Sequence, residues 1–234
     1  MLAVATGRPD MITQAIERLY DVFARYEPNT LQSSCPCCVD RKDVELLLSE
    51  PLRKIPPSLF SRYCHKAMTT FGTVQDYKHF LPRICELVAA GELENDPEIA
   101  LAGKLEYAEF ANWPQEEREA IESYLRVLWE DVLHTWRHPL NAGIALCCLT
   151  RILGSPADTL ETWAALLPTN RTARLHLAEW LTYGPGCDDR PPPFWEESPG
   201  GWAKVAMWIK SPAVAEVMQA AYDEWTQWQN EESA

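Results

Sequence analysis

The stretch WPQEEREAIESYLRVLWEDVLHTWR, residues 113–137, shows most plainly which kind of fold this chain adopts. Proline stands in its first turn, and Glu116 and Glu117 follow, where carboxylates favour the positive end of a helix dipole. Basic residues near its end suit the negative end of the dipole, and Pro139 stops the segment. The pattern predicts one long helix over this stretch.

The same helical period recurs along nearly the whole chain. Apolar residues return at intervals of three and four positions, and no alternating pattern typical of a strand reaches a useful length. Prolines mark the starts of several segments. We therefore expect an all-α protein of roughly ten helices, either a multi-helix bundle or an irregular HEAT-like α-solenoid. No fixed repeat period supports a regular repeat array.

The chain of 234 residues fits a single helical domain over residues 1–234. One long irregular segment, residues 184–201, is rich in proline and glycine. It also carries Phe194 and Trp195, which a mere tether would not need. We therefore expect an ordered, functional loop there rather than a domain linker.

Charge is unevenly spread along the sequence. The formal net charge is −13, with +2 over residues 1–85, −10 over residues 86–131 and −5 over the remainder. An acidic centre repels phosphate backbones, so we expect no nucleic-acid partner and instead a basic protein partner. A solvated face that keeps the protein soluble is the alternative explanation of the same charge.

The sequence opens without a secretory signal, and its apolar runs fall short of membrane-spanning length. We expect a cytoplasmic protein with no membrane partner. In that compartment the eight cysteines are expected to be thiols, some of them metal-bound, rather than disulfides.

The motif Cys35-Pro36-Cys37-Cys38 packs three thiols into four residues. Neighbouring thiols are open to oxidation unless a metal, a disulfide or burial protects them. Cys35, Cys37 and Cys38 can give zinc two or three of its four ligands, and His79 is a candidate for another because a following helix can fold back against the motif. The pattern predicts one structural zinc ion. A structured thiol loop without metal is the alternative.

Two groups of residues are candidates for binding a partner. Glu116 and Glu119 share one helix face, as do Glu119 and Glu122, and these acids would face a basic partner. Phe194 and Trp195 would supply an apolar anchor, because a few aromatic contacts usually carry affinity while charge sets the rate of approach.

Four stretches, together with Tyr63, resemble a known group of sequences: CPCCV at 35–39, KAMTT at 66–70, DYKHFLPR at 76–83 and KLEYA at 104–108. They are similar to a group of uncharacterised bacterial cytoplasmic proteins over about residues 30–130. The resemblance implies a bacterial origin and a helical fold. It carries over no activity and no catalytic residue.

Motifs for enzymatic chemistry are weak. The sequence shows neither a glycine-rich phosphate loop nor a Gly-x-Ser-x-Gly elbow. We expect a non-enzymatic protein-binding module, in its most concrete form an immunity protein that binds and neutralises a cognate bacterial toxin. Such proteins are commonly acidic when they compete for a basic cleft. The alternatives are a metal- or thiol-dependent enzyme centred on the cysteine motif and a helical scaffold protein.

Overall fold

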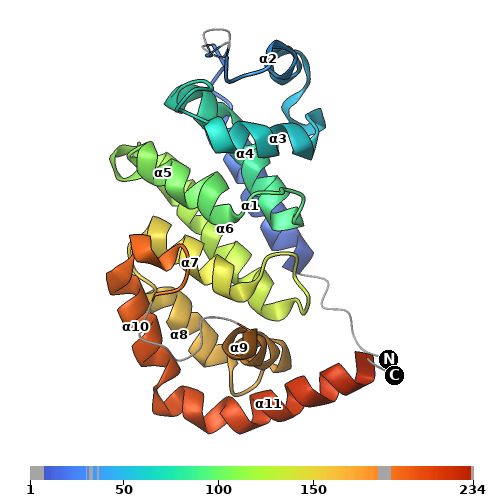
Figure 1. Cartoon of the computed structure of the whole chain (residues 1–234), viewed down its shortest axis with the longest axis vertical. Helices are drawn as coiled ribbons and strands as arrows, with labels where there is room; N and C mark the ends of the chain where they lie inside the picture. Colours follow the sequence, from blue (N-terminus) through green and yellow to red (C-terminus); the bar gives the residue numbers. More distant parts are fainter. Residues whose placement is uncertain (1–7, 30, 32–33, 36, 184–190, 233–234) are drawn as a thin grey trace. The chain divides into compact units, whose positions relative to one another are not determined.

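The computed structural model describes residues 8–29, 31, 34–35, 37–183 and 191–232 (Figure 1). Across these residues the chain forms helices and no strand, which confirms the expected all-α fold of roughly ten helices. The α-helices are α1 (Arg8–Phe23), α2 (Arg41–Ser49), α3 (Pro57–Lys66), α4 (Val74–Ala90), α5 (Gly103–Tyr107), α6 (Gln115–His134), α7 (Ala142–Leu153), α8 (Ala157–Leu166), α9 (Arg171–Tyr183), α10 (Pro199–Ile209) and α11 (Pro212–Glu232).

The irregular segment ends earlier than the sequence predicted. Residues 184–190 lie outside the described residues, Trp195–Glu197 form a 3₁₀ turn, and α10 begins at Pro199. Gly201 lies inside that helix, at a point where α10 runs close to α7. A Cβ at this position would lie only 2.6 Å from Thr150 Cγ2, so the close approach requires glycine. Gly201, one of the glycines that indicated a loop, therefore permits close packing within a helix instead.

The chain divides into two compact units, Met1–Leu128 and Trp129–Ala234, with the boundary inside α6. The expectation of one domain over residues 1–234 did not anticipate this division. These two parts are called unit 1 and unit 2.

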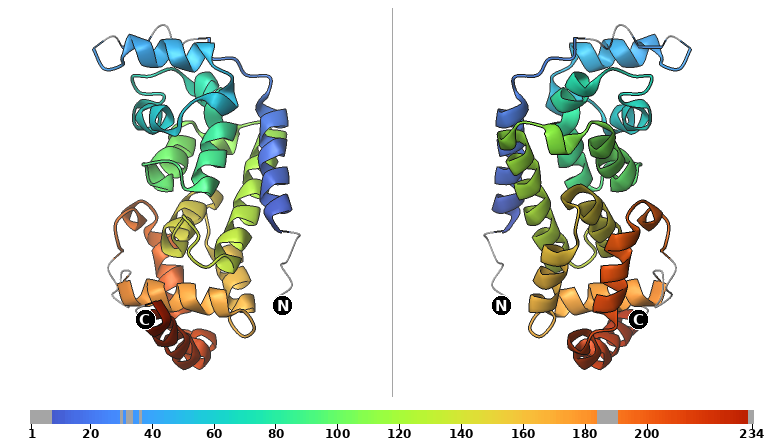
Figure 2. Two further views of the ribbon diagram at one scale, coloured as in Figure 1. Left: turned by 90° about the vertical axis from the view of Figure 1, so that its right-hand side faces the viewer. Right: turned by 90° about the vertical axis from the view of Figure 1, so that its left-hand side faces the viewer.

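Aromatic side chains form the core of unit 1. α1 lies along α4 (Figure 2), and α4 starts with a capping box between Thr73 and Asp76. From α4, Phe80 packs edge-to-face on Tyr63 of α3, with ring centroids 5.0 Å apart. Both rings are fully buried.

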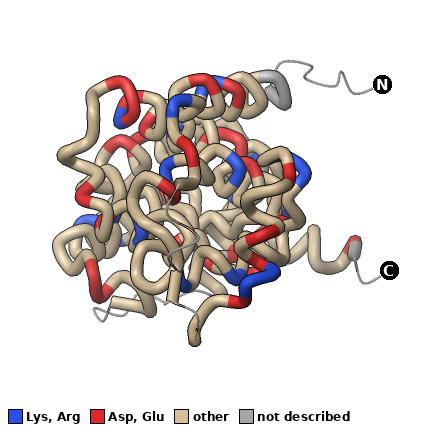
Figure 3. The backbone as a smooth tube through the Cα atoms, turned by 90° about the horizontal axis from the view of Figure 1, so that it is seen from above, with Lys and Arg blue, Asp and Glu red and all other residues tan. Residues whose placement is uncertain are grey.

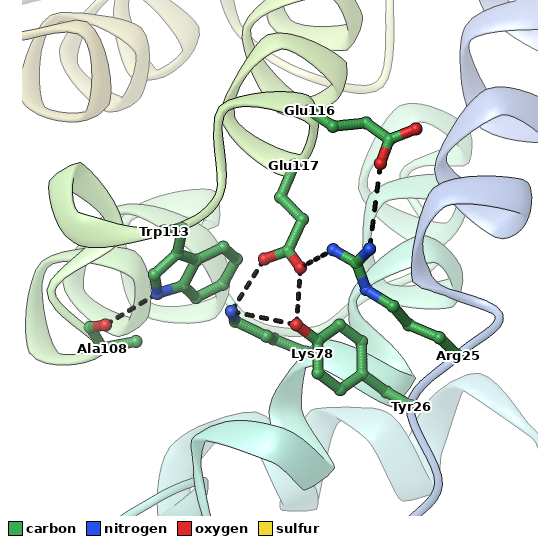
Figure 4. A network of polar contacts seen from close by, with 7 residues as sticks. All are labelled: Arg25, Tyr26, Lys78, Ala108, Trp113, Glu116 and Glu117. Carbon is green, nitrogen blue, oxygen red and sulfur yellow. Dashed lines mark hydrogen bonds and ion pairs between the residues drawn. The ribbon is translucent and has the colours of Figure 1, made fainter.

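A buried charge lies where three segments of unit 1 meet (Figure 4). Glu117, in the first turn of α6, is fully buried, and its Oε2 accepts a hydrogen bond of 2.7 Å from Lys78 Nζ of α4. Arg25 and Tyr26, just after α1, both donate to Glu117 Oε1. Lys78 Nζ also lies 4.0 Å from the ring centroid of Trp113. We call these five residues the Glu117 network.

The hydrogen bonds of this network decide the protonation of Glu117. Burial by itself raises the pKa of a carboxyl group, because it penalises the charged form. The bonds from Lys78, Tyr26 and Arg25 outweigh that effect and hold the pKa of Glu117 below its ordinary value of 4.5. The carboxylate is therefore ionised at neutral pH despite its burial.

Tryptophan fills the interior of unit 2. Trp129 and Trp163 are buried and meet edge-to-face with centroids 5.4 Å apart. Their indole N–H groups donate to the carbonyls of Thr159 and Ala173, so neither polar atom is buried without a partner. α9 and α11 pack against each other around Trp225 (Figure 1).

Of the helices in the described part of the chain, none combines the length and the apolar character that crossing a bilayer requires.

Replacing Glu117 with Gln should destabilise unit 1 by about 3–5 kcal/mol, because Lys78 would keep a buried charge without a counter-charge. Urea unfolding followed by circular dichroism measures the change. Glu116→Gln is the matched control: Glu116 pairs with Arg25 at 3.8 Å on the exposed side, and its loss should cost less than about 1 kcal/mol. Equal effects of the two substitutions would contradict a special role for the buried carboxylate.

The same pair of proteins tests the pH dependence. A carboxyl whose pKa is lower when folded stabilises the fold fully above its unfolded pKa, and this contribution disappears as pH falls through the folded pKa. The wild type should therefore lose more stability on acidification below pH 4.5 than Glu117→Gln does. Unfolding curves recorded at a series of acidic pH values measure the difference. Parallel losses in both proteins would show that Glu117 does not contribute.

Candidate metal centre

Three sulfur atoms gather at the turn between α1 and α2. Cys35 Sγ lies 2.9 Å from Cys37 Sγ, and Cys37 Sγ lies 3.6 Å from Cys38 Sγ. All three sulfurs lie within 4.8 Å of one another, which is close enough for one ion to contact all of them. The Cys35, Cys37 and Cys38 group, called the thiol cluster below, can therefore hold a metal ion.

Backbone hydrogen bonds set the shape of this turn. The amides of Cys38 and Val39 both donate to the Cys35 carbonyl, at 3.1 and 3.0 Å. Val39 is buried, and Asp40 then caps the start of α2 by accepting from the Lys42 amide at 2.9 Å. The sequence therefore closes the chain into a tight turn and at once starts a helix, which brings the thiols together.

Two contacts attach the turn to the rest of unit 1. The Cys35 amide donates to the Thr70 carbonyl at 3.1 Å, and Lys66 Nζ donates to the Cys38 carbonyl. Thr70 precedes Gly72, whose positive φ of 74° suits glycine and turns the chain into α4. The spacing of the cysteines does not predict that Lys66 and Thr70 contact this turn, because both residues lie about thirty positions further along the chain.

The thiols differ in how easily they lose a proton. A hydrogen bond from Cys37 to Cys35 stabilises the Cys35 thiolate and lowers the pKa of Cys35 to about 7. The same bond keeps the proton on its donor and raises the pKa of Cys37 to about 11. Burial raises the pKa of Cys64, elsewhere in unit 1, to about 12. The thiol cluster is thus the part of unit 1 where a thiolate forms near neutral pH.

The structure corrects the predicted role of His79. Its Nδ1 lies 2.7 Å from the Tyr26 carbonyl oxygen, and its ring packs against Phe80. Among the described residues, the group of mutually close ligand atoms contains the three cysteines and not His79. α4 places His79 at the end of α1 rather than at the thiol cluster.

Solvent reaches the thiol cluster directly. Cys37 and Cys38 are exposed and Cys35 is half-buried. A groove of about 520 Å³ lies nearby, between Leu31, Val39 and the α2 residues Val44 and Leu48, and its lining includes none of the three thiols. The cluster is therefore a surface site open to ions and small molecules rather than the floor of an enclosed pocket.

The acidic residues predicted to bind a partner remain at the surface but are partly compensated within the chain. Glu116 pairs with Arg25, Glu122 lies 3.2 Å from Arg126, and Glu119 accepts a bond of 2.7 Å from Gln115. Figure 3 marks the acidic and basic positions along the backbone. Glu119, which has no cationic partner among these contacts, is exposed.

Trp195 does not serve as the exposed anchor that the sequence predicted. Only 3% of its surface is exposed, and its ring lies 5.5 Å from that of Trp202. Phe194, which is half-buried, takes a positive φ of 69° and so turns the chain into the 3₁₀ helix that buries Trp195. An irregular segment with aromatic residues indicated a contact surface, whereas these rings fill the interior of unit 2.

Comparison of the chain with protein-family models, curated proteins and solved structures finds no match. The resemblance seen over about residues 30–130 stays a prediction.

Alkylation of the metal-free, reduced protein should modify Cys35 with a pH midpoint near 7. Cys37→Ala removes the donor of the stabilising hydrogen bond and should raise that midpoint toward the ordinary value of 9.0. Iodoacetamide labelling stopped at low conversion, with tryptic mapping of residues 26–41, measures the site and the rate. Identical pH profiles in wild type and Cys37→Ala would show that this bond does not tune Cys35.

Proposed function

We propose that this protein binds one zinc ion through Cys35, Cys37 and Cys38, and that the ion stabilises the turn between α1 and α2. The observation that carries the proposal is the approach of the three sulfur atoms to within 4.8 Å of one another. Thiolates are the ligands that zinc prefers in structural sites.

The distances suit zinc with a small adjustment. Zinc–sulfur bonds of about 2.3 Å in a tetrahedron separate the sulfurs by about 3.8 Å. Cys37 and Cys38 stand at 3.6 Å, close to that value, and Cys35 and Cys37 would open from 2.9 Å. Rotation about the cysteine side-chain bonds supplies such a movement, because exposed side chains at Cys37 and Cys38 meet little steric resistance.

The fourth zinc position is left to a ligand from outside the group. Within the described part of the chain, the mutually close ligand atoms belong to three residues, whereas a tetrahedral zinc takes four ligands. We propose that a water molecule would take this position when zinc is bound. A structural role follows from the attachment of the turn to Thr70 and Lys66, because metal binding at a preformed turn adds to folding free energy.

Zinc added to the reduced protein should bind at one ion per chain, and Cys35→Ser, Cys37→Ser or Cys38→Ser should each weaken it strongly, because each removes one of three thiolates. Elemental analysis after gel filtration and a thermal melt measure binding and stabilisation. His79→Gln is the control and should bind as wild type. Cobalt substitution tests the open position, since an added anion should shift the cobalt spectrum. Loss of zinc in His79→Gln, or wild-type protein without zinc, would contradict the proposal.

A second candidate function rests on charge. We propose that the protein also binds a basic protein partner, in the most concrete case a toxin that it neutralises as an immunity protein. The supporting observations are the net charge of −10 over residues 86–131 and the exposure of Glu116 and Glu119 on α6. Charge of one sign steers an oppositely charged partner and raises its association rate.

A partner captured from the source organism should associate more slowly with Glu119→Lys than with wild type, because this substitution reverses an exposed charge without breaking an ion pair. Raised salt should slow the wild type as well. Surface plasmon resonance measures both rates. Glu122→Lys serves as the comparison, because Glu122 already pairs with Arg126 in the wild type. This substitution should slow association less than Glu119→Lys does. If the association rate changes neither with salt nor with either substitution, the acidic residues serve only to keep the protein soluble.

A further inference from the structure

Cys35 and Cys37 form the tightest pair in the thiol cluster. Their sulfurs lie 2.9 Å apart, against about 2.05 Å for a bonded pair of sulfurs. Two residues separated by one other have Cα atoms at most about 7 Å apart, and disulfides bridge Cα distances of about 4.4–6.8 Å. The spacing therefore permits a disulfide, and the sulfurs need to approach by only about 1 Å to reach bonding distance.

The third thiol is less suited to join a disulfide. Cys38 Sγ lies 3.6 Å from Cys37 Sγ, and a bond between adjacent cysteines closes a ring of eight atoms that distorts the peptide between them. The other described thiols, Cys64, Cys85, Cys147 and Cys148, are buried. Cys35 and Cys38 also lie within 4.8 Å of each other, but the 2.9 Å separation and the exposure of Cys37 favour the pair of Cys35 and Cys37.

We propose that Cys35 and Cys37 are a reversible oxidation site, and that a disulfide between them releases the metal ion from the thiol cluster. The release part rests on the proposed zinc site, whereas the disulfide part does not. The oxidant we consider is hydrogen peroxide, a small molecule that reaches exposed sulfurs.

The reaction proceeds in two balanced steps. One thiol attacks a peroxide oxygen, the O–O bond breaks, and a sulfenic acid and one water form. The second thiol attacks the sulfenic sulfur, the S–S bond forms, the S–O bond breaks, and a second water leaves. Two thiols lose two electrons and two protons in total, and one peroxide is reduced to two waters.

Oxidation removes two of the three ligands at once. A disulfide sulfur is a far weaker ligand for zinc than a thiolate, so the ion would keep only Cys38. A single exposed thiolate does not hold zinc against dilution. Metal loss would also free the turn between α1 and α2 from the stabilisation that the ion adds.

The test uses one tryptic peptide. Cleavage after Arg25 and Arg41 releases residues 26–41, which contain Cys35, Cys37 and Cys38 and no other cysteine. In metal-free reduced protein, iodoacetamide should add three groups to this peptide. After mild peroxide treatment it should add one, located on Cys38 by fragmentation, and dithiothreitol should restore three. Three groups after peroxide, a free thiol at Cys35 or Cys37 instead of Cys38, or oxidation that dithiothreitol does not reverse would overturn the proposal.

Two matched variants separate the disulfide from metal binding. Cys35→Ser and Cys38→Ser each remove one thiolate from the cluster, so both should bind zinc poorly. Only Cys38→Ser should still form the disulfide, with its peptide accepting no iodoacetamide after peroxide. Cys35→Ser should keep both remaining thiols. Equal oxidation of the two variants would overturn the assignment of the pair.

Zinc-loaded wild type tests the release. Peroxide should transfer zinc to a chromogenic chelator at the rate at which the disulfide appears by peptide mapping. Zinc that stays bound after the disulfide has formed would overturn the release. Wild type that never binds zinc would refute the proposed function instead, and the metal-free experiment would still decide whether the disulfide forms.

Discussion

Glu117 carries a negative charge into the interior of unit 1, and the groups that compensate it come from segments far apart in the sequence. Lys78 belongs to α4, and Arg25 and Tyr26 follow α1. An uncompensated carboxylate in this position would be costly, so α1, α4 and α6 must meet in the one arrangement that supplies all three donors. Sliding one helix along another would separate Glu117 from its donors, so the buried ion pair adds its own constraint to that of apolar packing. The network thus sets the register of the helices around the core of Phe80 and Tyr63.

The thiol cluster is attached to this framework from both sides. The chain leaves the network at Tyr26 and reaches Cys35 after Leu31, which is fully buried. On the other side, Thr70 and Lys66 hold the turn just before α4 begins. A site at the surface is therefore attached to two helical segments, and backbone hydrogen bonds hold its three thiols close together.

Sequence patterns were most informative where the cause of structure is local. Proline starts, first-turn acids and the 3.6-residue period act within one helix, so α6 and most other helices were predictable. α10 was missed because Gly200 and Gly201 suggest a loop, and the reason for Gly201 is a neighbour from α7. The spacing of the three thiols indicated a local site, and the turn closed on the Cys35 carbonyl brings their sulfurs together. The errors at His79 and Trp195 share one origin: sequence spacing does not tell which way a side chain faces once helices pack. The burial of Glu117 could not be predicted from its place in the first turn of α6, because its partners Lys78 and Arg25 lie dozens of residues away.

The tryptophans have an uneven distribution with a practical consequence. Nine of the ten belong to unit 2, and Trp113 alone belongs to unit 1. Intrinsic fluorescence of this protein will therefore report almost wholly on unit 2, where rings such as Trp129 and Trp163 lie in contact. Trp113 sits against the ammonium group of Lys78, and a nearby charge shifts indole emission. Converting the other nine tryptophans to phenylalanine would leave a single fluorescent probe at the buried ion pair. In the unaltered protein, unfolding of unit 1 alone would change the tryptophan fluorescence very little.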